Sequence, residues 1–214
     1  MPDLSKTAPL RIAVSSGSLA HPLAGLLALH REQAPDSLPS LVETGNADLF
    51  EGIRGGNYDV AVSLEPSSDK SLVSVPIWRD EVAVALPTRH PLLERGEIEL
   101  AELARYPLVL WSPDRCEALA SQVNTLLNVA RRPLNVEHWA VSFEMLITMV
   151  AAGYGAGLAA KSRIVGARDA GVIMRPLGGA PNWLTTYLIY PAGSQGGIVE
   201  RFVERAKTAA EAIE

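Results

Sequence analysis

The sequence predicts an α/β fold in which two lobes enclose an interlobe cleft. Short apolar runs alternate with helical patterns along most of the chain, which is typical of parallel strands joined by right-handed helical crossovers. Segments with glycine and proline at 87–91 and 178–181 would let the chain leave one lobe and return to it. We therefore expect three parts: lobe I at residues 9–87 and 182–214, lobe II at residues 88–181, and an N-terminal tail at residues 1–8.

The composition is that of a globular protein and argues against an intrinsic nucleic-acid surface. Among 214 residues, 48% are apolar and 20% are charged, and the net charge of −5 comes without any cluster of Lys and Arg that could bind phosphates. Cys116 is the only cysteine, which excludes a disulfide within the chain. No run approaches the roughly 20 apolar residues of a membrane span, and the N-terminus lacks a secretory h-region. These features predict a cytoplasmic location.

The first part of the chain has the pattern of three strands joined by two helices. Strands are predicted at 10–14, 38–42 and 60–64, and the intervening helices carry apolar residues at helical spacing. On the first helix these are Leu19, Leu23, Leu26 and Leu27 with His30, and on the second they are Leu49, Phe50 and Ile53. Ligands bind beyond the carboxyl ends of such parallel strands, and here those ends carry small hydroxyl, amide and glycine residues.

The middle of the chain predicts two more strands and then a second β/α unit. Residues 71–87 read as two strands with a bend at 78–80. A short helical turn near 100–105 precedes a strand at 108–111 and a helix that carries Leu119, Val123, Leu126, Leu127 and Ala130, with Asp114 as its N-cap.

The last third alternates strands and helices in the same way. Ser142 is the predicted cap of a helix at 143–153 that is apolar nearly all round, which indicates burial on more than one side. A terminal helix with Ile198, Phe202, Ala206, Ala210 and Ile213 should pack back on lobe I. The remaining predicted elements are strands at 135–139, 156–160, 172–176 and 183–190 and a helix at 161–171.

No pattern in the sequence favours an enzyme, a metal or a cofactor. The four histidines are scattered without metal-ligand spacing, and no nucleophile elbow surrounds Ser15 or Ser16. The glycine string at 153–157 precedes a strand instead of joining a strand to a phosphate-binding helix. Asp48 and Glu51 share a helix face that we expect to be solvated.

Five segments, in order along nearly the whole chain, carry a family resemblance. They are LRIAVSS, ETGNADLFEGIRGGNYDVAV, VAVALPTRHPL, ELARYPLVL and MVAAGYGAGLAAKS. Together they resemble the effector-binding domain of LysR-type transcriptional regulators. The resemblance implies the type 2 periplasmic-binding-protein fold with two Rossmann-like lobes, and a small-molecule effector in the cleft that controls DNA binding by the full-length protein. It also implies an N-terminal winged helix-turn-helix that this chain lacks, so we expect a fragment that does not itself bind DNA.

The resemblance also implies which residues contact the effector. By position these are Ser15, Ser16, Gly17, Asn46, Pro113, Asp114, Val141, Ser142 and Phe143. Cys116 lies in the same turn as two of them and is a further candidate contact to the effector. Backbone N–H groups at helix N-termini, with hydroxyl and amide side chains, suit a carboxylate or another ligand that bears acceptors. Simple helix capping is the alternative role for the serines.

One position departs from the family. Some members bind an anionic effector with an arginine just after the third strand, where this chain has Leu64. Arg115, Lys161 and His138 are the candidate substitutes, and a solvated surface charge is the alternative role for each.

Cys116 could have a redox role, and the first helix could take part in oligomerisation. Cys116 continues an apolar helix face, which favours a buried, inert thiol over a redox sensor. The resemblance implies a homodimer or tetramer in which the helix at 19–33 meets the second lobe of a partner. The alternative functions are a free-standing periplasmic-type solute-binding protein and, less favoured, an enzyme on the same scaffold.

Overall fold

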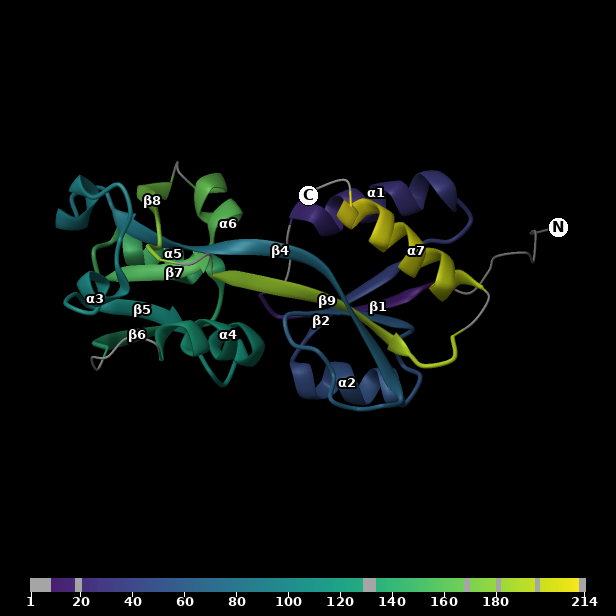
Figure 1. Ribbon diagram of the computed structural model, residues 1–214. Coiled ribbons are helices and arrows are strands. Elements are labelled where there is room, and N and C mark those ends of the chain that lie inside the picture. The colour runs from purple at the N-terminus through teal and green to yellow at the C-terminus, as the bar shows by residue number, and fades with distance from the viewer. Residues whose placement is uncertain are drawn as a thin grey trace. The chain divides into compact units, whose positions relative to one another are not determined.

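The computed structural model describes residues 9–17, 21–128, 134–167, 170–179, 182–194 and 197–211 (Figure 1). These residues form two compact α/β units. Unit 1 comprises the described parts of Met1–Trp78 and Thr185–Glu214, and unit 2 comprises those of Arg79–Leu184. The bounds predicted for lobe I and lobe II remain a prediction. No helix within the described ranges is both long and apolar enough to cross a membrane.

Unit 1 contains the predicted parallel strands. Strand β1 (Arg11–Ser15) lies between β2 (Ser40–Thr44) and β3 (Val60–Ser63) and is parallel to both. Strand β9 (Trp183–Pro191) pairs with β3 in the antiparallel direction, with Ala61 opposite Ile189. The two parallel pairs confirm the crossover arrangement expected from the sequence.

Helices cover both faces of this sheet (Figure 1). Helices α1 (His21–Gln33) and α7 (Ile198–Glu211) lie side by side on one face, and α2 (Asn46–Arg54) lies on the other. The alternation along β1 explains the two layers, because Ile12 and Val14 pack with α1 and α7 whereas Ala13 packs with Leu49 and Ile53 of α2. Each fully buried Leu or Ile contributes about 1.5–3 kcal/mol to the stability of the sheet. The predicted Leu19 lies outside the described residues.

Strand β2 is an exposed edge rather than a buried strand. It begins two residues later than the apolar run at 38–42. Leu41 and Val42 within the strand are 42% and 41% exposed, and Leu38 just before it is 66% exposed. Strand pairing still occurs on one side only, where the residues of β2 pair with those of β1. The apolar character of this run therefore reflects strand propensity and not burial.

The prediction of two strands between 71 and 87 is wrong, because β4 (Leu72–Pro87) is one continuous strand. Trp78, at the expected bend, is 6% exposed and packs in the core beneath α1 and α7. Asp80 and Glu81, which belong to unit 2, have partners within that unit: the Ser162 hydroxyl donates to Asp80, and Lys161 pairs with Glu81 at 2.6 Å. Asp80 and Glu81 therefore do not interrupt the strand, since the side chain of each has a partner.

Unit 2 is built around three parallel strands. Strand β5 (Leu108–Trp111) lies between β6 (Val136–Ala140) and β7 (Ala156–Ala160), and β4 continues the sheet from β7 and also pairs with β8 (Val172–Pro176). The other elements of unit 2 are η1 (Pro91–Glu94), α3 (Leu100–Leu103), α4 (Glu117–Leu127), α5 (Phe143–Ala151) and α6 (Lys161–Gly166).

Helix α5 is buried on one face, which corrects the prediction of burial on more than one side. Its buried residues Phe143, Leu146, Ile147 and Val150 follow the spacing of a single helical stripe, whereas Met145 is 46% exposed. The buried stripe packs closely on β7. A Cβ atom at Gly157 would lie 2.8 Å from Leu146 and 2.9 Å from Val150, so glycine is needed there for this approach.

Candidate functional site

In unit 1 the predicted site residues gather at the carboxyl ends of neighbouring strands. Ser15 is in register with Thr44, and the Ser16 amide donates to the Thr44 carbonyl at 3.2 Å. Gly17 has a φ of 87°, a conformation that suits glycine and turns the chain away from the sheet. Asn46 follows β2 as the first residue of α2. The structure therefore brings these four predicted residues to one edge of the sheet.

Glu65 belongs to the same edge and was missed from the sequence. The Asn46 side chain is 8% exposed and its Nδ2 donates to Glu65 Oε2 at 2.9 Å. The Glu65 amide donates to the hydroxyl of Ser63, a fully buried side chain, at 3.0 Å. Because β3 lies next to β1, the residues after β3 reach this edge as well, and that is the signal that could have identified Glu65.

In unit 2 the second group of predicted residues gathers at the ends of β5 and β6. Trp111 is in register with Ala140, and the Ser112 amide donates to the Ala140 carbonyl at 2.8 Å. Cys116 joins the two turns, because its Sγ donates to the Val141 carbonyl at 3.3 Å. The other predicted residues lie in these turns: Pro113 and Asp114, both exposed, and Ser142 and Phe143.

The two predicted helix caps in this region differ in outcome. Ser142 caps α5 as expected, and its Oγ accepts from the Met145 amide at 3.1 Å. Asp114 does not cap α4, because a turn closed by the Cys116 amide on the Ser112 carbonyl delays the helix and makes Cys116 its N-cap residue. The Cys116 side chain makes no cap hydrogen bond and is 2% exposed, in agreement with the prediction of a buried thiol.

The three cationic residues that the sequence suggested for binding an anionic effector have different surroundings. Arg115 is exposed, Lys161 is paired with Glu81, and the His138 ring packs edge-on against Tyr154 at 5.0 Å. Arg115 belongs to the turn after β5, whereas the contacts cited for Lys161 and His138 do not join them to the turns after β5 and β6.

Arg163, which was not predicted, does reach those turns. Its guanidinium lies 4.1 Å from the centre of the Phe143 ring, and it forms a long ion pair with Glu144 at 3.7 Å. A cation over an aromatic face is attracted by the ring quadrupole, so Phe143 and Arg163 hold one another in place.

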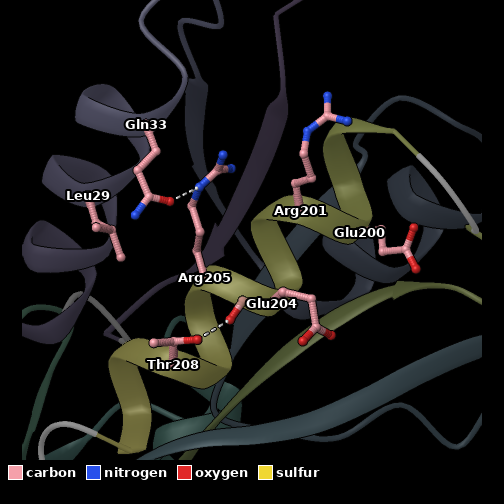
Figure 2. Close-up of a pocket in the computed structure, with 7 residues that line it drawn as sticks. All are labelled: Leu29, Gln33, Glu200, Arg201, Glu204, Arg205 and Thr208. Atoms are coloured by element: carbon pink, nitrogen blue, oxygen red, sulfur yellow. Dashed lines mark hydrogen bonds between the residues drawn. The ribbon is translucent and has the colours of Figure 1, made fainter.

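A separate groove of about 460 Å³ lies between α1 and α7 in unit 1 (Figure 2). Arg205 points toward Gln33 across it, and its Nε donates to Gln33 Oε1 at 2.8 Å. None of the predicted site residues lines this groove. Its lining residues are Leu29, Gln33, Glu200, Arg201, Glu204, Arg205 and Thr208.

Beside the groove lies His30, a fully buried histidine. Its Nε2 is 3.0 Å from the Ser37 carbonyl and its Nδ1 is 3.4 Å from Arg205 Nη1. A carbonyl only accepts and a guanidinium only donates, so this geometry requires a neutral ring with its proton on Nε2. Burial lowers the pKa of His30, opposed by the bond to Ser37 and assisted by the nearby Arg205 charge. No group of three or more metal-ligating side chains occurs within the described ranges.

The fold and these strand ends define a class of protein. Two α/β units, each with parallel strands whose carboxyl ends carry small polar residues, are those of the periplasmic-binding-protein-like fold. The chain matches the LysR substrate binding domain family over residues 5–211 and belongs to that family. It is therefore a ligand-sensing regulatory domain of the LysR type, as the five sequence segments indicated.

Solved structures and curated relatives agree with this assignment. The effector-binding domain of QuiR in complex with shikimate has a TM-score of 0.84 at 14% identity, covering 96% of this chain and 98% of its own. The regulator CysB of Burkholderia cenocepacia is 28% identical over 79% of this chain and 54% of its own length. The probable regulator LrrA of Synechococcus elongatus is 31% identical over 70% of this chain and 49% of its own length. The chain thus spans about half the length of these curated relatives.

These relatives are described as transcriptional regulators. The alternative of a free-standing periplasmic solute-binding protein is not supported, because the family match is to the LysR substrate binding domain.

Proposed function

We propose that this chain binds a small-molecule effector at the strand ends of its units and thereby controls transcription by a full-length regulator. The observation that carries the proposal is the gathering of predicted residues within each unit. Ser15, Ser16, Gly17 and Asn46 share one strand edge in unit 1, and the turns after β5 and β6 are joined by Cys116 in unit 2. Membership of the LysR substrate binding domain family supports a role for these strand ends in binding an effector.

The proposed mechanism is a shift in population between two poses of the units. An effector can change that equilibrium only through its different affinity for the two poses. The change is passed on through a homodimer or tetramer, in which helix α1 meets the second unit of a partner chain. DNA is contacted by an N-terminal domain of the full-length protein. In this function the chain does not catalyse a reaction, and it works in the cytoplasm.

A thermal-shift screen of the purified chain against a broad metabolite panel tests this function. We expect at least one metabolite to raise the melting temperature, and Asn46→Ala or Ser16→Ala to reduce that rise. Asp48→Ala is the matched control, because Asp48 is on the exposed face of α2 and should leave the response unchanged. The proposal is wrong if no metabolite stabilises the chain, or if both site variants respond as the native chain does.

A further inference from the structure

We propose that Glu65 sets the charge preference of the site, so that the effector presents a cationic ammonium group, not a carboxylate, to unit 1. This inference rests on the proposed function and names the chemical class of its ligand. It differs from the sequence-based expectation, in which helix N-termini and hydroxyl groups favoured a carboxylate.

The protein itself supplies a carboxylate where an effector's carboxylate was expected. Asn46 is the first residue of α2, and the cap position before it, Gly45, offers no side-chain hydrogen bond. Asn46 Nδ2 instead donates to Glu65 Oε2 at 2.9 Å, and the Glu65 amide is fixed by Ser63 Oγ at 3.0 Å. Because Asn46 is 8% exposed, its amide is a fixed donor that is already used.

The charge of Glu65 has no basic partner within the described parts of the chain. None of the ion pairs found there includes Glu65, whereas Glu81 of unit 2 is paired with Lys161 at 2.6 Å. The residues that end β1, β2 and β3, at 15–17, 44–46 and 63–65, include no Lys or Arg. Leu64, where an arginine would serve an anionic effector, is apolar and 4% exposed.

Glu65 adds a negatively charged acceptor to this edge of unit 1. Glu65 is exposed, and within the described residues only its Oε2 has a hydrogen-bond partner. The remaining oxygen Oε1 and the side-chain oxygen of Asn46 both accept hydrogen bonds. An ammonium group supplies three donors and the opposite charge, whereas a carboxylate supplies neither.

Three probes with the same four-carbon chain test the inference: 1,4-diaminobutane, butane-1,4-diol and succinate. Melting temperature and calorimetric binding are measured for the native chain, for Glu65→Gln and for Glu51→Gln. Glu65→Gln keeps an oxygen for Asn46, removes the charge and replaces the other oxygen by an NH2 group. Glu51→Gln removes the same charge from the exposed face of α2. We expect the native chain to favour the diamine over succinate on the order of tenfold in affinity, since the charges attract at short range.

The expected loss of this preference in Glu65→Gln, with the preference kept in Glu51→Gln, supports the inference. It is overturned if succinate binds more tightly than the diamine, if the native chain responds to none of the three probes, or if the diamine response persists in Glu65→Gln. These outcomes are separate from failure of the proposed function, which follows if no metabolite of any charge stabilises the chain or if the Asn46 and Ser16 variants respond as the native chain does.

Discussion

The buried histidine of unit 1 predicts how stability depends on pH. His30 is fully buried between the Ser37 carbonyl and the Arg205 guanidinium, so a second ring proton has no acceptor and meets a like charge. Burial lowers the pKa of His30 below its ordinary value of 6.5, and the unfolded chain therefore binds the proton more readily than the folded chain. The stabilisation is fully present above pH 6.5 and is lost as the pH falls from there toward the lowered pKa.

The magnitude follows from the uptake of one proton. The free energy of unfolding should fall by up to about 1.4 kcal/mol for each pH unit within that window. Urea denaturation at a series of pH values from about 5 to 8 measures this slope for the native chain and for His30→Gln, which cannot titrate. We expect the variant to have the smaller slope below pH 6.5. Other groups titrate equally in both proteins, so the difference between the two slopes isolates His30.

Gln33→Ala is the matched control for this experiment. Gln33 accepts from Arg205 at 2.8 Å but has no titrating group (Figure 2). Loss of the Gln33 side chain should lower the free energy of unfolding at every pH. The change of that free energy with pH should stay the same as in the native chain. Equal slopes for the native chain and His30→Gln would refute the reasoning, because the proton would then bind elsewhere.

Two further substitution pairs test the packing around the candidate site. Ser142→Ala should cost about 1 kcal/mol of stability through loss of the cap bond from Met145, whereas Asp114→Ala should change stability by less than about 0.5 kcal/mol, as both urea denaturation curves would show. Leu49→Ala should cost about 2–5 kcal/mol because the side chain is fully buried, and Leu41→Ala, 42% exposed on β2, should be near neutral. A cost for Leu41→Ala similar to that for Leu49→Ala would contradict the assignment of β2 as an exposed edge.

The order of strands and helices could be predicted from the sequence, whereas the burial of their residues could not. Strands β5, β7 and β8 have the predicted bounds, because short apolar runs between polar or glycine-bearing turns are a local signal. Apolar character alone did not indicate burial: the run at 38–42 is largely exposed, and α5, predicted to be buried on more than one side, exposes Met145. Whether an apolar residue is buried depends on which element packs against it, and that is a tertiary property.

In the candidate site, too, some residues could be predicted from the sequence and others could not. Residues close behind a strand end, such as Asn46 and Ser142, could be nominated because the family resemblance carries over to their positions. Glu65 and Arg163 could not, because each matters through a partner elsewhere in the fold, the Asn46 amide and the Phe143 ring. The failed prediction of a bend near Trp78 has a related cause, since distant contacts keep the strand continuous.

The division of the chain between the two units has a consequence for folding during synthesis. Unit 2 is one uninterrupted stretch, Arg79–Leu184, whereas unit 1 needs both Met1–Trp78 and Thr185–Glu214. Strand β3 must therefore wait for β9, its partner at Ala61 and Ile189, and α1 must wait for α7. We expect unit 2 to fold first as the chain leaves the ribosome, while the apolar sheet face of unit 1 stays uncovered until the last helix emerges. A chain truncated before α7 is thus expected to aggregate through unit 1, with unit 2 already formed.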